Sequence, residues 1–405
     1  MIEKNNMKAI YYDVLYLAAC GVNGITPSQK CVESYIENEE MMRLLFRFCR
    51  SHFIEALVGM TLQKAEVLIP KEWSQSVSKA VRKVILFDVE RTKICSYMEK
   101  RGIWHLTLKG IILKDFYPVV GMRQMSDNDI LIDENYAQEM KDYMQSQGYK
   151  VESFGFGNHD VYEKEPVYAF EFHRSLFNTL YSVVWDEYYR KIKDKLILDE
   201  GVSYGYHMRD EDFYIYIICH AYKHYKGGGT GIRSLIDFYV YLQKKESVLD
   251  FEYIEKECEK LKIADFEKAN RILCKKVFAQ DICKSTNDKS DSLSYDMDGF
   301  WKSLTQTEQE MLMYYLSSGV YGTFENIVDN KMKKYKKSDG KISKGRYVFR
   351  RIFPDMDTYR LYFPFFYKHK WLLPVGWFYR IIRMLFVGKR RKKMMKEVRI
   401  VKKNS

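Results

Sequence analysis

Two aspartates separated by a single residue, Asp127 and Asp129, have the types and spacing that most directly predict chemistry. An apolar run at residues 130–132 follows them, which is typical of a buried strand. In an extended chain alternate side chains point to the same face, so the two carboxylates are expected side by side. They repel each other unless a cation lies between them, and a hard divalent ion such as Mg²⁺ or Mn²⁺ prefers oxygen ligands. The pair predicts a metal site; the alternative is a surface turn before an ordinary strand.

A third acid, Glu171, fits the same chemistry. It alternates with Phe170 and Phe172 in a predicted strand, and His173 shares its face. An ionised glutamate in a core strand needs a partner, and the metal site of the two aspartates could supply it. Three carboxylates on adjacent strands can hold the two metal ions of in-line phosphoryl transfer. We therefore expect Asp127, Asp129 and Glu171 to be the catalytic, metal-binding residues.

The surrounding residues resemble a known family. Residues 104–133 and 168–176 are similar to the uncharacterised bacterial nucleotidyltransferase family of the polymerase-beta-like nucleotidyltransferase superfamily. The resemblance is carried by Leu108, Lys109 and Gly110, by Tyr117 and Pro118, by Arg123, by residues 126–132, and by Glu171 and His173. It extends more loosely to residues 220–237 and 367–383. It implies a mixed sheet flanked by helices, a glycine turn that grips a nucleoside triphosphate, two aspartates that bind magnesium, and a third acid on a neighbouring strand.

The resemblance implies that Gly110 grips the nucleotide, and we also expect nucleotide-binding roles for Lys109, Arg123 and His173. Ile111 follows Gly110 where the superfamily usually has Gly or Ser. Arg123 could hold phosphate as a planar fork, or form a surface ion pair with a nearby acid. Lys109 could contact phosphate, or be a solvated lysine at the end of a strand.

Two histidines four residues apart, His220 and His224, lie on one face of a predicted helix. They could reach the substrate phosphates, which would make them nucleotide-binding residues, or a metal ion; the alternative is a pair of partly buried, hydrogen-bonded helix histidines. Arg233 and Asp237 have the spacing of an i,i+4 ion pair, and the resemblance places them near the active cleft.

The predicted reaction is transfer of a nucleoside monophosphate from a nucleoside triphosphate to an unidentified hydroxyl or amine acceptor, with release of pyrophosphate. Glycosyltransferases also use paired aspartates, but there the pair usually ends an apolar strand, whereas here the apolar residues come after it. The alternative function is a non-catalytic partner of the same fold in a membrane-proximal or cell-surface polysaccharide assembly.

The pattern along the chain predicts an α+β protein, with a small mixed-sheet nucleotidyltransferase core embedded in a mostly helical chain. We expect a helical region at residues 1–100, the α/β core at 101–176, a helical domain at 177–329 and a basic, aromatic segment at 330–405. Within the core, the expected order is strand, helix, strand, helix, strand, strand.

Charge is concentrated at one end of the chain. Residues 331–405 hold 24 lysines and arginines against 4 acidic residues, a net charge of +20, which leaves −8 for the rest of a chain whose total is +12. Ten aromatic residues lie at 361–388, interrupted by Arg380 and Arg383, so a transmembrane helix is not predicted. This segment could lie on an anionic membrane surface, pack on the protein's own core, or, least favoured, bind nucleic acid.

The eight cysteines form no CxxC pair, and no histidine cluster completes a zinc pattern. Glu3, Lys4 and Asp13 interrupt the first apolar stretch, so no secretory signal is predicted. We expect a cytoplasmic protein with free thiols, either wholly soluble or peripheral to the inner face of the membrane.

Overall fold

The computed structural model describes residues 2–179, 181–284, 297–333, 335, 343–354, 356, 359, 363–386 and 388–403. The chain divides into two compact units, one formed by residues 1–222 and 230–320 and the other by residues 223–229 and 321–405. The four-part division predicted from the sequence stays a prediction.

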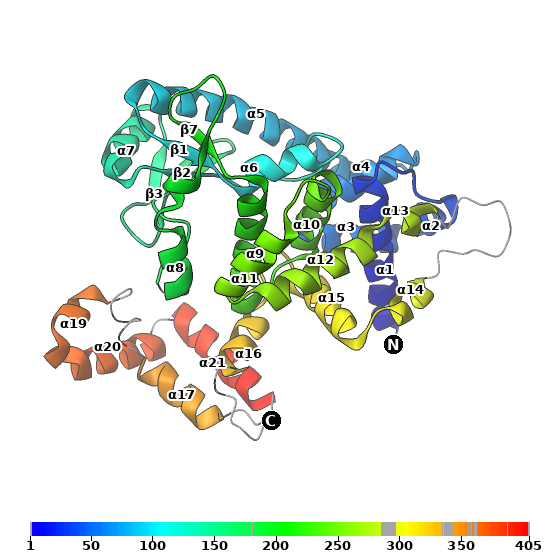
Figure 1. Ribbon diagram of the computed structural model, residues 1–405. Helices are drawn as coiled ribbons and strands as arrows, with labels where there is room; N and C mark the ends of the chain where they lie inside the picture. The colour runs from blue at the N-terminus through cyan, green and yellow to red at the C-terminus, as the bar shows by residue number, and fades with distance from the viewer. Residues whose placement is uncertain are drawn as a thin grey trace. The chain divides into compact units, whose positions relative to one another are not determined.

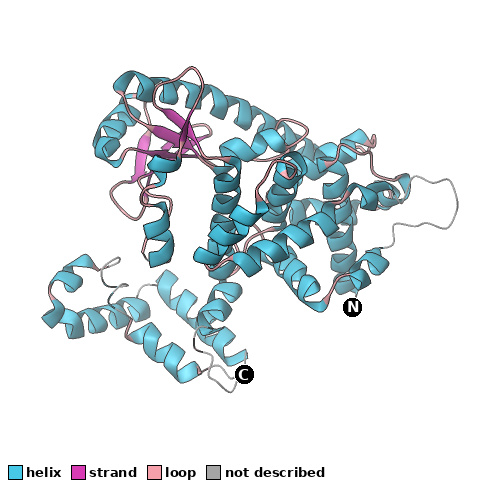
Figure 2. Ribbon diagram, viewed as in Figure 1, coloured by secondary structure: helices cyan, strands magenta, loops and turns pink. Residues whose placement is uncertain are grey.

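The first unit holds all the described strands, gathered at one end among helices (Figures 1 and 2). Its strands are β1 (His105–Thr107), β2 (Asn128–Ile132), β3 (Lys150–Ser153), β4 (His159–Lys164), β5 (Tyr168–His173), β6 (Ile197–Leu198) and β7 (Gly205–His207). They form a mixed sheet in the order β3-β4-β5-β2-β1-β7-β6, in which β2 is parallel to β5 and antiparallel to β1. The predicted α+β class, a mixed sheet in a mostly helical chain, is confirmed.

The helices of the first unit precede the sheet, connect its strands and follow it. They are α1 (Ile2–Val22), α2 (Gln29–Ile36), α3 (Glu39–His52), α4 (Glu55–Lys64), α5 (Lys71–Arg101), α6 (Lys109–Leu113), α7 (Ala137–Ser146), α8 (Val183–Tyr189), α9 (Asp210–Gly227, whose last turn belongs to the second unit), α10 (Ile232–Lys245), α11 (Phe251–Lys260), α12 (Ala264–Phe278), α13 (Gln280–Lys284), α14 (Met297–Ser303) and α15 (Gln306–Ser318). Short 3₁₀ turns lie at Lys114–Phe116, Glu134–Tyr136 and Ile192–Lys195.

One face of the sheet is apolar because its strands alternate. Ile130 and Ile132 of β2 and Phe170 and Phe172 of β5 are all buried in one core cluster. The long helix α5 and the helix α7 supply the other side of that core, through residues such as Val84, Phe87, Met140 and Met144. Since every second residue of these strands enters the core, Asp129 and Glu171 must face the opposite side of the sheet.

Three strands were not predicted. β4 lies between two strands that were, and β6 and β7 come from a stretch expected to be helical. β7 pairs in parallel with β1, about a hundred residues earlier, at His105 opposite Gly205 and Leu106 opposite Tyr206. β6 and β7 have two and three residues, too few to show a period of two in the sequence, and β7 is held in the sheet by this distant partner.

The second unit is helical in its described part. It contains α16 (Phe324–Lys333), α17 (Lys344–Ile352), α19 (Pro364–Lys368), a 3₁₀ turn at Lys370–Leu372, α20 (Leu373–Phe386) and α21 (Gly388–Lys403). Val328, Met332 and Tyr347 form its small buried core. Glu397 of α21 pairs with Arg351 of α17, with a nitrogen–oxygen distance of 2.6 Å, and so holds these two helices together.

The aromatic segment predicted at 361–388 falls in this unit. Tyr362 lies outside the described residues, and the side chains of Arg383 and Phe386 are likewise not described. Phe365, Trp371 and Phe378 are each more than half exposed. Among the described residues, no helix is both long and apolar enough to cross a membrane.

Candidate active site

The acidic pair stands at the start of the central strand β2. Asp127 immediately precedes the strand and Asp129 is its second residue. On the neighbouring parallel strand β5, Glu171 lies directly opposite Asp129 in the register. The structure thus brings the three predicted carboxylates to one face of two adjacent strands.

Asp129 is almost fully buried and holds two partners. Its Oδ2 lies 3.0 Å from Nζ of Lys109, and its Oδ1 lies 3.0 Å from Nε2 of His173. Burial favours the protonated acid, but the Lys109 ammonium and His173 outweigh it and hold the pKa of Asp129 well below its usual range. Asp129 is therefore an ionised carboxylate.

Asp127 has a different environment. Burial and the neighbouring Asp129 carboxylate raise the pKa of Asp127, and the positive charges of Lys109 and Arg233 only partly oppose this. Lys83 of α5 donates from Nζ to the backbone oxygen of Ser126, at 2.9 Å, and so fixes the turn that presents Asp127. A cation beside Asp127 would relieve the repulsion between the two aspartates.

Glu171 has two histidine neighbours. Its Oε2 lies 3.6 Å from Nε2 of His159 and 3.6 Å from Nε2 of His173. Burial, together with the Asp129 and Asp127 carboxylates, raises the pKa of Glu171 to about 8. Without a further cation, this acid keeps its proton at neutral pH.

Lys109 and Gly110 lie in the first turn of α6. Lys109 links two predicted site residues, because its Nζ lies 3.0 Å from Asp129 and 3.1 Å from Nε2 of His220. A side chain at position 110 would meet Nη1 of Arg123 at 3.0 Å and the end of Met125 at 3.1 Å. Gly110 therefore makes room for the packing of these two residues, and its grip on phosphate stays a prediction.

Arg123 is buried and forms an ion pair with Asp237 of α10. Its Nε and Nη2 donate to the two carboxylate oxygens at 2.8 and 3.0 Å, and the hydroxyl of Tyr117 donates to the same carboxylate at 2.8 Å. The expected i,i+4 pair of Arg233 with Asp237 is thus replaced by a pair with Arg123. The phosphate-binding role of Arg123 stays a prediction. In this structure its guanidinium is already hydrogen-bonded to the carboxylate of Asp237.

Arg233 contacts a backbone oxygen and an aromatic ring instead. Its Nη1 donates to the backbone oxygen of Gln124 at 3.4 Å, and its guanidinium lies 5.4 Å from the ring centre of Phe53. Among the described residues, no carboxylate lies within 4.0 Å of it. Burial and the neighbouring Arg123 lower the pKa of Arg233, and its charge acts on Asp127. A half-buried cation in this position is suited to bind an anionic group of a substrate.

His224 follows His220 by one turn of α9, in the stretch that belongs to the second unit. Its nucleotide-binding role stays a prediction.

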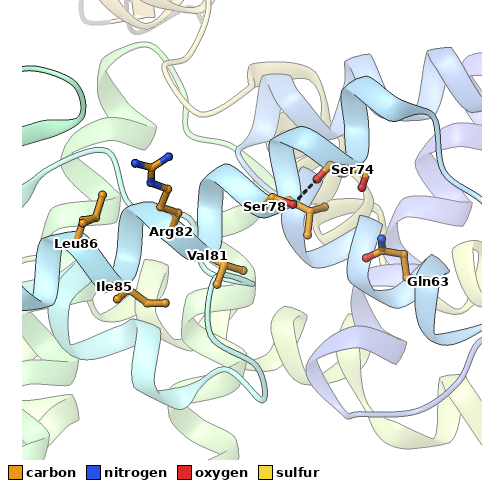
Figure 3. A pocket seen from close by; sticks show the side chains of 8 residues that line it. Gln63, Ser74, Ser78, Val81, Arg82, Ile85 and Leu86 are labelled. Atoms are coloured by element: carbon orange, nitrogen blue, oxygen red, sulfur yellow. Dashed lines mark hydrogen bonds between the residues drawn. The ribbon is translucent and has the colours of Figure 1, made fainter.

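A surface pocket of about 490 Å³ lies elsewhere, along α4 and α5 (Figure 3). It is lined by Gln63, Ser74, Val77, Ser78, Val81, Arg82, Ile85 and Leu86. The hydroxyl of Ser78 is already bonded to the backbone oxygen of Ser74, at 3.0 Å. This pocket shares no residue with the carboxylate cluster, and Arg82 is the one charged side chain in its lining. It therefore lacks the acidic residues that a metal-dependent reaction needs.

The donor set of the cluster fits a hard divalent cation. Three carboxylates meet on one face of the sheet, and among the described lysines and arginines only Lys109 forms an ion pair with one of them, Asp129. Burial and the neighbouring carboxylates raise the pKa of Asp127 and of Glu171, and a bound cation would oppose both effects.

Comparison with known families agrees with this geometry. The sequence model of a family described as "Uncharacterised nucleotidyltransferase" matches residues 38–279, well over half of the chain. The chain belongs to this family. The match includes all three acids, Lys109 and α10, and it ends before residue 321, where the longer segment of the second unit begins. Comparisons with curated proteins and with solved structures found no match.

Membership of this nucleotidyltransferase family supports a transferase role that uses a nucleoside triphosphate and a divalent metal ion. Sequence reasoning gave three residues near the acids no site role of their own: Lys83, His159 and Arg233. His159 belongs to no sequence motif. It joins the site only because the strand register places it opposite His173. The sequence predicted an ion pair of Arg233 with Asp237. In the structure Asp237 pairs with Arg123 instead, so Arg233 is not held by that carboxylate.

Proposed function

We propose that this protein transfers a nucleoside monophosphate from a nucleoside triphosphate to a hydroxyl or amine acceptor. Asp127, Asp129 and Glu171 would hold magnesium, or manganese in its place. The observation that carries the proposal is the register of β2 and β5, in which Glu171 stands opposite Asp129 within the stretch that the family model matches. The bound ions would neutralise the triphosphate and activate the attacking oxygen.

The remaining residues would bind and orient the substrate. Arg233, a half-buried cation without a carboxylate ion-pair partner among the described residues, would hold a phosphate oxygen. Lys109 would share its charge between Asp129 and the triphosphate, and His220, in contact with its Nζ, would position that ammonium. Glu171, once ionised, would hold a metal ion or accept the proton of the acceptor.

The alternative function is a non-catalytic partner with the same fold. The ion pair of Lys109 with Asp129 favours it, because a lysine can neutralise one carboxylate without a metal ion. That single contact leaves Asp127 and Glu171 without an ion pair to lysine or arginine among the described residues. Unbalanced acids on one face argue for a site that receives cations, so we prefer the catalytic function.

The compartment that we propose is the cytoplasm. All eight cysteines are free, and seven of them are buried. Free thiols are typical of a reducing environment.

A thermal melting titration tests the metal and nucleotide site. Ligand that binds only the folded protein stabilises it by about 2.7 kcal/mol at a hundred times its dissociation constant. We expect Mg²⁺ with a nucleoside triphosphate to raise the Tm of the wild type and not of Asp127→Asn. Asp133→Asn is the matched control, since Asp133 only caps a 3₁₀ turn through Asn135. An equal rise in the wild type and in Asp127→Asn would contradict the proposed site.

A further inference from the structure

Two histidines and one glutamate meet at the outer edge of the carboxylate cluster. His159 of β4 stands directly opposite His173 of β5 in the antiparallel register, and Glu171 precedes His173 by two residues on the same face. One ligand atom from each of the three residues can be chosen such that all lie within 4.8 Å of one another. The Glu171 Oε2 is 3.6 Å from Nε2 of each histidine, and the two imidazole ring centres are 5.0 Å apart.

This ligand set differs in kind from that of the aspartate pair. Imidazole nitrogen suits borderline ions such as Zn²⁺, Fe²⁺ or Co²⁺, whereas Mg²⁺ prefers oxygen alone. Two histidines and one glutamate, with a further position open, form a recurring ligand set of zinc enzymes. Ligands of a tetrahedral zinc ion stand about 3.3 Å apart, because each bond is about 2.0–2.1 Å long. Small side-chain rotations would bring the three atoms to that spacing.

The surroundings leave room for an ion. In the part of the chain that the structure describes, the only ion-pair partners of Glu171 are these two histidines. The side chain of His159 is 36 % exposed and that of Glu171 is 26 % exposed, so an ion could enter from solvent and keep a water ligand. On the inner side, Asp129 Oδ1 lies 3.0 Å from Nε2 of His173 and offers a further oxygen.

We propose that His159, Glu171 and His173 form a binding site for a zinc-like transition-metal ion, beside the magnesium site of Asp127 and Asp129. The proposal deepens the proposed function, with which it shares Glu171, since it assigns one metal position to a different class of ion. The ion would replace the contact between His173 and Asp129 and would hold Glu171 in its ionised form. Two neighbouring positions with different ligands would then select two different ions.

The test is a metal titration of the full chain after treatment with a chelator. Zn²⁺ binding is measured by calorimetry, and Co²⁺ serves as a second probe because its visible absorption reports nitrogen and oxygen ligation. We expect one equivalent of Zn²⁺ to bind the wild type, and His159→Ala to weaken that binding at least tenfold through loss of one ligand. His159→Gln, which keeps the size of the side chain, gives the same comparison if the alanine variant does not fold.

His207→Ala is the matched control, because His207 lies on β7 of the same sheet and also contacts a carboxylate, that of Asp199. It should bind Zn²⁺ as the wild type does. Asp127→Asn separates the two proposals: it should lose stabilisation by Mg²⁺ and nucleotide while keeping its Zn²⁺ site. Equal Zn²⁺ affinity in the wild type and in both His159 variants, or no stoichiometric Zn²⁺ binding to the wild type, would overturn this inference and leave the nucleotidyltransferase proposal standing.

Discussion

Replacing Asp237 by asparagine removes the charge that neutralises Arg123. Arg123 is 7 % exposed, and both oxygens of Asp237 accept hydrogen bonds from its guanidinium. The pair joins α10 to the loop that runs from Tyr117 to Asp127, and Arg233 lies one turn before Asp237 on the same helix. The substitution therefore leaves two like charges together in a buried place, next to the acidic site.

The expected loss in the free energy of unfolding follows from the burial of this ion pair. Breaking a buried ion pair by removing one partner costs about 3–5 kcal/mol, because the remaining charge is left without compensation. A unit of this size then loses on the order of 10 °C in Tm. Glu39→Gln is the control: it breaks the exposed pair with Arg43, whose two side chains are 77 % and 68 % exposed, and should cost about 0–1 kcal/mol.

The assay is chemical or thermal unfolding of the wild type and the single variants, with the double variant Arg123→Met/Asp237→Asn to close the cycle. We expect the double variant to lose less stability than the sum of the two single variants, since it removes both charges. If Asp237→Asn unfolded at the same Tm as Glu39→Gln, the buried pair would not stabilise this part of the fold and the reasoning would be refuted.

The remaining predictions concern Glu171 and the second unit. Glu171→Gln should reduce nucleotide transfer nearly as much as loss of an aspartate, and His173→Ala should reduce it less; steady-state kinetics measures both, and a fully active Glu171→Gln would contradict the proposed role. Folded, metal-free protein keeps the Glu171 proton to about pH 8, whereas an unfolded glutamate releases it near pH 4.5, so the folded state binds more protons and stability falls as pH rises across this window. The expected fall in stability is on the order of a few kcal/mol and is measured by following unfolding from pH 5 to 8. It should be absent in Glu171→Gln and present in the exposed control Glu152→Gln. Identical pH profiles of the wild type and Glu171→Gln would contradict this prediction. The basic segment should bind anionic vesicles weakly at low salt and release them at high salt, since each basic residue near the surface contributes about 1 kcal/mol that salt screens. Co-sedimentation of the full chain against a chain ending at Leu385 measures this, and equal sedimentation of the two would exclude it.

The sequence was sufficient to predict the features of the site that depend on strand alternation. Asp129 and Glu171 each interrupt an apolar strand pattern, so their shared face could be predicted before their pairing was known. The strands β2 and β5 carry that pattern over five and six residues, long enough for the period to be visible.

Long-range partners could not be predicted in the same way. Asp237 pairs with Arg123 across 114 positions, and the local i,i+4 spacing to Arg233 favoured the wrong partner. His159 joins the cluster only through the register of β4 with β5, which is set by packing on both faces of the sheet. Propensity and spacing describe neighbours along the chain, whereas these contacts are decided by the tertiary fold.

The central claim is that the acids at Asp127, Asp129 and Glu171 support metal-dependent nucleotide transfer. The most direct measurement is mass spectrometry of the protein and of added metabolites after incubation with each labelled nucleoside triphosphate and Mg²⁺. Asp127→Asn is the sharpest variant, because Asp129 also neutralises the half-buried Lys109. We predict a labelled nucleoside monophosphate adduct with the wild type, formed about a thousandfold more slowly or not at all with Asp127→Asn. Equal adduct formation by the two proteins would contradict the assignment.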